Sequence, residues 1–148
     1  MKKIYLASDH GGFKVKKELL SFLHQKGYLV KDLGPTMFNS HDDYPDYVIP
    51  LARKVAKDNK SVGVVICRNG QGVCIATNKV KGIRAVTGFS IKEVRTTRKD
   101  DNANVLCVPA DYLKKEEIKK IVLKWLKTPF SHALRHQRRL QKIKKVER

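Results

Sequence analysis

Short apolar runs alternate along the chain with longer segments in which apolar residues recur at helical spacing. The apolar runs predict five strands, over residues 3–7, 28–33, 62–66, 83–86 and 104–108. The remaining segments predict helices over residues 13–26, 44–58, 73–79, 90–98, 113–126 and 131–144. Because strands and helices alternate, we expect an α/β, doubly wound, Rossmann-like fold: a five-stranded, mainly parallel sheet with helices on both faces.

The length and the apolar runs limit the class of protein. At 148 residues, the chain fits a single domain over 1–148, with 130–148 as a C-terminal basic helix. No apolar run approaches the ~20 residues that cross a bilayer, and the run after the basic start is too short for a signal peptide. We therefore expect a cytoplasmic protein without a membrane partner.

The net charge of +18 comes from 32 basic and 14 acidic residues. Such an excess is typical of proteins that bind polyanions, and the segment 114–148 alone holds 13 Lys/Arg against 3 Glu. However, lysine is spread over nearly every amphipathic segment, and few aromatic residues interleave in 114–148 to stack on bases. We keep a nucleic-acid binder as an alternative and favour a small phosphorylated ligand, which also profits from a positive field.

Ligands of doubly wound sheets bind in the crevice beyond the carboxyl ends of the strands. We expect three loops there, close to one another: residues 9–12, residues 67–72, and the region around Asp100 and Asp101. The loop 67–72, Cys-Arg-Asn-Gly-Gln-Gly, leaves a buried strand and opens a helix. Its glycines permit positive φ, and its amides can bind a phosphate, a carboxylate or a developing enolate oxygen. It matches neither a Walker A loop nor GxGxxG.

Cysteine chemistry is the most specific signal in this loop. Cys67 precedes a helix N-terminus in a basic protein, a setting that lowers a thiol pKa, and its thiolate can act as nucleophile or general base. A Cys–His hydrolase that uses His10 is the rival chemistry. Three cysteines without a CxxC pair argue against a disulfide framework or a structural zinc site, so Cys74 and Cys107 are expected in the core.

Other polar residues are candidates for ligand binding, and each also has a plain structural interpretation. Asp9 and His10 follow the first strand, which also suits a surface loop, and Tyr44 can cap the pocket or simply pack. Arg135 and Arg139 lie one turn apart on the last helix. They can clamp a phosphate or form one more solvated basic face.

Several motifs occur together in an order that resembles a known family. They are SDHGGFKVKKEL, DYPDY at 43–47, ICRNGQG, IATNKVKGIRAV, NANVL and RHQRR. The chain resembles the ribose-5-phosphate isomerase B family, which includes the galactose-6-phosphate isomerase subunits, over nearly its whole length. The resemblance implies an aldose–ketose isomerase that works through a cis-enediolate without a metal or other cofactor. It also implies a homodimer or homotetramer with the active site between subunits.

The resemblance implies a role for each candidate residue. Cys67 matches the catalytic base that moves a proton between C1 and C2, and Asn69 lies in the anion hole that holds the enediolate. The implied substrate contacts are Asp9, His10, Tyr44, Arg68, Gly70, Gln71, Gly72, Arg135 and Arg139.

The chain departs from the family pattern in ways that bear on its substrate. Arg68-Asn69 replaces Gly-Thr or Ser-Thr, Asp100-Asp101 replaces a His-Asn pair whose His opens the sugar ring, and Asp111 replaces an arginine. Three explanations stay open: Asp100 is the ring-opening acid, Asp101 binds the hydroxyls of a different sugar, or the enzyme takes the open chain. Ribose 5-phosphate is the expected substrate; another pentose or hexose phosphate, or a catalytically inactive regulatory homologue, is the alternative.

Overall fold

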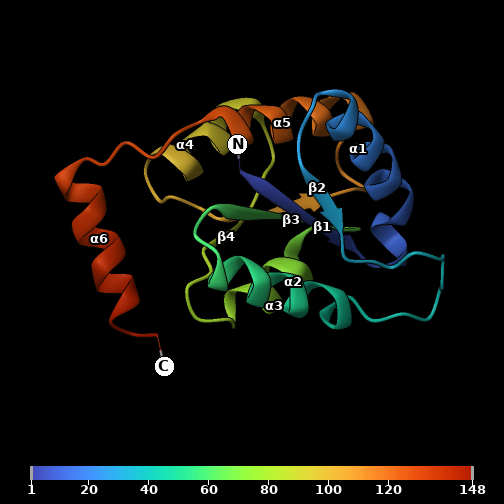
Figure 1. The fold of residues 1–148 in the computed structure, drawn as a ribbon, viewed down its shortest axis with the longest axis horizontal. Coiled ribbons are helices and arrows are strands. Elements are labelled where there is room, and N and C mark those ends of the chain that lie inside the picture. The colour runs from blue at the N-terminus through green and yellow to red at the C-terminus, as the bar shows by residue number, and fades with distance from the viewer. Residues whose placement is uncertain (1, 148) are drawn as a thin grey trace.

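The protein is described here by a computed structural model, in which residues 2–147 are placed (Figure 1). Five parallel strands form one sheet in the order β2-β1-β3-β5-β4, which confirms the expected α/β class. Their bounds are β1 Lys3–Ser8, β2 Val30–Asp32, β3 Ser61–Cys67, β4 Ala85–Thr87 and β5 Val105–Pro109. Every strand runs the same way, so all five carboxyl ends lie along one edge of the sheet.

Helices cover both faces of the sheet, as the alternating pattern predicted. Their bounds are α1 Phe13–Gln25, α2 Pro45–Lys57, α3 Gln71–Asn78, α4 Ile91–Lys99, α5 Lys115–Lys127 and α6 Leu134–Lys144, with a short 3-10 helix η1 at His10–Gly12. Helices α1, α4 and α5 lie on one face, and α2 and α3 on the other (Figure 1). None of the helices in residues 2–147 is long and apolar enough to span a bilayer.

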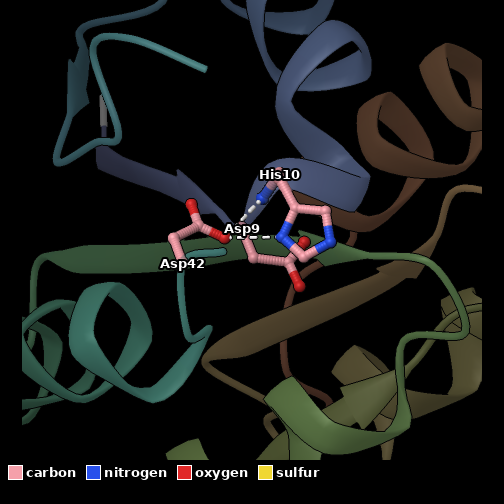
Figure 2. Close-up of side chains that lie close together, drawn as sticks. All are labelled: Asp9, His10 and Asp42. Carbon is pink, nitrogen blue, oxygen red and sulfur yellow. Dashed lines mark hydrogen bonds and ion pairs between the residues drawn. The ribbon is translucent and has the colours of Figure 1, made fainter. Parts of the chain in front are cut away.

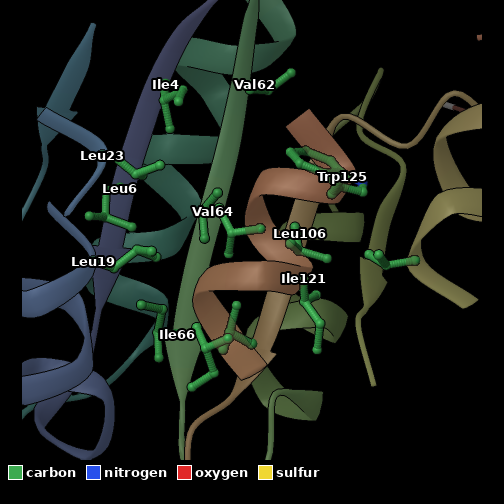
Figure 3. Close-up of a cluster of buried hydrophobic side chains, with 14 of the residues drawn as sticks. Ile4, Leu6, Leu19, Leu23, Val62, Val64, Ile66, Leu106, Ile121 and Trp125 are labelled. Atoms are coloured by element: carbon green, nitrogen blue, oxygen red, sulfur yellow. The ribbon is translucent and has the colours of Figure 1, made fainter. Parts of the chain in front are cut away.

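Alternating side chains of the central strand enter two different cores. Val64 and Ile66 of β3 pack with Leu19 of α1 and Trp125 of α5 on one face (Figure 3). Cys67 belongs to the core on the other face, with α2 and α3. This period-two alternation explains why the run 62–66 is apolar at nearly every position, since both faces are buried.

Some boundaries differ from the sequence expectations for local reasons. The loop predicted before α1 contains η1, because the Asp9 side chain accepts a hydrogen bond from the Gly12 amide and closes a turn. Ser90 caps α4 as predicted, in a reciprocal capping box with Glu93. The second strand is limited to Val30–Asp32 at the edge of the sheet, where it pairs with β1 alone.

Helix α6 lies at the end of the sheet where the strands begin, away from the carboxyl edge (Figure 1). A cavity of about 460 Å³ separates it from the body of the protein. Lys2, Ser61 and Asn104, which precede or begin strands, line this cavity on one side, and Leu140 and Lys144 of α6 line it on the other. The amino edge of the sheet is therefore the edge that faces the C-terminal helix.

Candidate active site

Cys67 ends β3 at the carboxyl edge of the sheet, directly before the glycine-containing loop. The residue is only 5% exposed, and the Gly70 amide donates a hydrogen bond to its Sγ at 3.2 Å. Backbone N–H groups of Val73 and Asn69 also favour its thiolate. The sulfur is thus placed beneath a set of amides from the start of α3.

Burial nevertheless raises the pKa of the Cys67 thiol above its ordinary value, and the nearby Asp9 carboxylate raises this pKa further. The amides of Val73, Gly70 and Asn69 act in the opposite direction without overcoming the desolvation. The expectation of a lowered pKa is therefore wrong for this chain. A helix N-terminus stabilises a thiolate, but the strand end that places the thiol there also removes it from water.

Asn69 has an orientation that its contacts determine. Its Oδ1 accepts a hydrogen bond from the Gln71 amide at 3.0 Å and lies 3.8 Å from Cys67 Sγ. Because the carbonyl oxygen is used within the loop, the Nδ2 amino group is the part of this side chain left to donate to a ligand. The geometry therefore suits the predicted contact with an anionic oxygen.

Two glycines of the loop permit its shape. Gly70 has φ of +72°, a left-handed conformation that favours glycine, and a Cβ there would lie 3.1 Å from the Pro109 nitrogen. A Cβ on Gly72 would lie 2.7 Å from Cζ of Tyr44. The phenol of Tyr44 therefore lies against the first turn of α3, beside the loop as predicted.

The loop after β1 lies next to the cysteine loop. A Cβ on Gly11 would lie 2.5 Å from Cγ of Arg68, so the two loops are in close contact. Asp9, which is 8% exposed, accepts a hydrogen bond from the Gly12 amide at 3.2 Å. The structure thus brings together Asp9, His10, Tyr44 and the residues 67–72, as expected from their positions after parallel strands.

His10 is held by a carboxylate from the loop between β2 and α2 (Figure 2). Asp42 Oδ1 accepts a hydrogen bond from the His10 amide at 3.0 Å and lies 2.7 Å from His10 Nδ1. Ligand atoms of Asp9, His10 and Asp42 all lie within 4.8 Å of one another, which is a spacing that a metal ion could use. His10 Nδ1, however, is already engaged by Asp42.

The prediction that Asp100 and Asp101 lie near Cys67 is wrong within one chain. Both residues follow α4 and precede β5, so they lie at the amino edge of the sheet. Asp100 instead faces helix α6, where its Oδ1 is 3.7 Å from His136 Nδ1. Loops that precede parallel strands lie at the opposite edge of the sheet from loops that follow them. The order of the elements along the chain therefore already places Asp100 and Asp101 at the amino edge.

The two predicted phosphate-binding arginines lie at the amino edge too. Arg135 and Arg139 are exposed on α6, one helical turn apart. One chain therefore carries two groups of candidate residues at opposite edges of its sheet.

Comparison with known proteins identifies the family. A family model described as Ribose/Galactose Isomerase matches residues 4–143. A protein of Mycoplasma genitalium named "Probable ribose-5-phosphate isomerase B" is 44% identical over 146 residues, which cover 98% of this chain and 95% of that protein. The chain belongs to the ribose/galactose isomerase family.

Solved structures of the family superpose closely on this chain. The ribose-5-phosphate isomerase B of M. genitalium, solved with bound ribulose-5-phosphate, matches with a TM-score of 0.94 at 44% identity, covering 98% of this chain and 95% of the other. The type B enzyme of Trypanosoma cruzi matches with a TM-score of 0.94 at 32% identity, covering 99% and 97%. This member of the family is thus an isomerase of the aldose–ketose class.

The two further cysteines of this ribose/galactose isomerase are Cys74 on α3 and Cys107 on β5. Cys107 is fully buried as predicted, whereas Cys74 on α3 is only half-buried. A hydrogen bond from Cys107 lowers the pKa of Cys74 to about 6, and burial raises the pKa of Cys107 itself. Cys107 is thus the hydrogen-bond donor to Cys74.

Sequence reasoning missed two residues of the site. Asp42 and Phe38 are absent from the predicted candidates, yet Asp42 holds the His10 ring, and the Phe38 ring packs edge-on against His10 with centroids 6.4 Å apart. Both come from a long loop without periodicity, which contains no pattern that says where its side chains point. The length of that loop is the only feature of the sequence that points to a role in the site, because long loops in compact folds are frequently functional.

Proposed function

We propose that the protein interconverts ribose 5-phosphate and ribulose 5-phosphate through a cis-enediolate, with Cys67 as the base. The observation that carries the proposal is the Cys67 sulfur at the carboxyl edge, beneath the Gly70 amide and beside the Asn69 side chain. The likeness to a solved isomerase that holds ribulose-5-phosphate supports the choice of substrate. No step in this proposal uses a metal.

The proposed reaction moves one proton between neighbouring carbons. The Cys67 thiolate takes the proton from C2 of the open-chain aldose, the electron pair forms a C1–C2 double bond, and the C1 oxygen becomes negative. The Asn69 Nδ2 group and the amides at the start of α3 stabilise this oxygen. A proton then moves from O2 to O1, and the thiol returns its proton to C1, which leaves a ketone at C2.

We propose further that a second copy of the chain completes each site. Arg135, Arg139 and Asp100 lie at the amino edge, so the Cys67 loop of one chain can meet them only on another chain. Two apolar residues at the C-terminal end, Ile143 and Val146, are 49% and 78% exposed, which is typical of a surface that another protein covers. In the assembled site the two arginines bind the phosphate and Asp100 protonates the ring oxygen.

The direct test uses the purified full-length chain alone. We expect turnover of ribose 5-phosphate, and, in D₂O, incorporation of deuterium at C1 of ribulose 5-phosphate seen by NMR. A panel of other pentose 5-phosphates and hexose 6-phosphates measures specificity by kcat/KM. A higher kcat/KM on another sugar phosphate would assign that sugar, and not ribose 5-phosphate, as the substrate. No turnover on any of them would favour a catalytically inactive homologue.

A further inference from the structure

Asp42 makes a two-point contact with His10 that the reaction scheme above does not use. A single oxygen, Oδ1, accepts from the backbone amide of His10 at 3.0 Å and lies 2.7 Å from Nδ1 of its ring. The Asp42 side chain is 4% exposed, whereas the His10 side chain is 26% exposed. The carboxylate is thus buried behind a partly exposed imidazole.

This contact determines which nitrogen of the ring meets a ligand. An ionised carboxylate only accepts hydrogen bonds, so Nδ1 must carry the proton that it donates to Oδ1. In the neutral ring, Nε2 is then an acceptor. Figure 2 shows that Nε2 points away from Asp42. When its ring is neutral, His10 can therefore accept a hydrogen bond from a hydroxyl group through Nε2.

Asp42 itself is placed by its loop and by burial. Its amide donates to the Asn39 carbonyl at 3.2 Å, which closes a turn around the residue. Its Oδ2 is buried and has no hydrogen-bond partner within residues 2–147. A buried carboxylate binds the ring more strongly than a solvated one, because little water competes for its charge. The Phe38 ring packs edge-on against the His10 ring and so limits rotation of the imidazole from another side.

We propose that Asp42 is a positioning residue, which fixes His10 in its Nδ1–H tautomer so that Nε2 accepts a hydrogen bond from a sugar hydroxyl. The proposal rests on the proposed function for the identity of that sugar. Asp42 does not touch the substrate, so its whole effect on binding passes through His10. The carboxylate does for this histidine what an orienting carboxylate does for a catalytic imidazole in other enzymes.

The first test reads the tautomer without substrate. Two-bond ¹H–¹⁵N NMR spectra of the full-length chain are expected to show the Nδ1–H form for neutral His10, assigned by loss of its signals in His10→Ala. In Asp42→Ala the ring is expected to revert towards the Nε2–H form, and in Asp42→Asn, which keeps an acceptor oxygen, to stay Nδ1–H. The matched control is Asp46→Ala, which removes an exposed carboxylate from the first turn of α2. An Nε2–H ring in the wild-type chain would overturn the proposal.

The second test asks whether the effect passes through His10. Loss of one hydrogen bond to a charged group predicts a fall in kcat/KM of about tenfold for Asp42→Ala, mainly as a rise in KM. Asp42→Asn is expected to lose about threefold or less, and Asp46→Ala to match the wild type. In a His10→Ala background, Asp42→Ala should add nothing.

Additive losses in that cycle would mean that Asp42 acts by stability alone and would overturn the proposal, as would an unchanged kcat/KM for Asp42→Ala. These outcomes differ from failure of the proposed function, which would show as no turnover by the wild-type chain. In that case the tautomer measurement still judges the contact between Asp42 and His10, because it needs no substrate.

Discussion

The two edges of the sheet carry different halves of the candidate chemistry. At the carboxyl edge, Cys67 is buried, and the backbone amides of its loop are directed at it. At the amino edge, Arg135 and Arg139 are exposed, and Asp100 Oδ1 lies 3.7 Å from His136 Nδ1 of α6. The first group is held by hydrogen bonds within its own loop, while the second group lies at the opposite edge of the same sheet. In the proposed function, this separation is the reason why one chain holds the reacting atoms and another chain holds the phosphate.

The largest effect should follow from removing the thiol at the carboxyl edge. Cys67→Ala deletes the proposed base, and we expect kcat to fall by about 10³-fold or more, because no other group takes its proton. Deuterium exchange into ribulose 5-phosphate, followed by NMR, checks the same step. Cys74→Ala, which removes a thiol from α3 nearby, is the matched control and should retain activity. Exchange at the wild-type rate in Cys67→Ala would show that Cys67 is not the base.

The next largest effect tests the amino edge. Ribose 5-phosphate closes a furanose ring, but ribulose 5-phosphate, whose O5 carries the phosphate, stays open. If Asp100 opens the ring, Asp100→Asn should slow turnover of ribose 5-phosphate by about 10²-fold. The same variant should leave deuterium exchange into ribulose 5-phosphate unchanged. Equal losses in both assays would assign Asp100 a structural role, and no loss in either would mean that ring opening is unaided or belongs to another residue.

The pH dependence sharpens the difference between the two cysteines near the carboxyl edge. Because burial raises the pKa of Cys67 and the base must be ionised, kcat/KM should rise about tenfold per pH unit through neutrality. Alkylation by iodoacetamide, followed by peptide mass spectrometry, should rise in the same way for Cys67. For Cys74, with a pKa of about 6, the rate should be nearly constant above neutral pH. A flat kcat/KM over the same range would contradict a buried thiol as the base.

The smallest but most specific effect is recovery of activity when chains with a variant carboxyl edge are mixed with chains with a variant amino edge. Cys67→Ala and the double variant Arg135→Ala/Arg139→Ala should each be nearly inactive alone. Refolded together in equal amounts, half of the dimers are mixed, and each mixed dimer has one intact site of two. Activity should therefore recover to about a quarter of the wild-type value. No recovery, although mixed dimers are seen by native mass spectrometry, would place the whole site within one chain.

Much of the fold was predictable because each element satisfies a local rule. The apolar period of β3, the Ser90 cap of α4 and the glycine turn at the start of α3 all agree with the structure. The neighbourhood of Cys67 and His10 was also predictable, since both follow parallel strands. The position of Asp100 was predicted wrongly, although the order of α4 and β5 places it at the opposite edge.

The pKa of Cys67 and the role of Asp42 lay beyond the sequence for different reasons. A helix N-terminus can be recognised in a sequence, but the depth at which it holds a thiol depends on the packing of α2 and α3. Asp42 lies 32 positions from His10, in a loop without periodicity. No local rule links such residues.

The sequence by itself determined the α/β class, the order of the elements and the residue types of the carboxyl-edge site, because strand and helix periods and glycine turns are properties of short segments. Only the tertiary structure decided that the thiol is desolvated, that Asp42 holds His10, and that the arginines lie at the far edge. Those facts depend on the distances between segments far apart in the chain, and such distances exist only after the segments have packed.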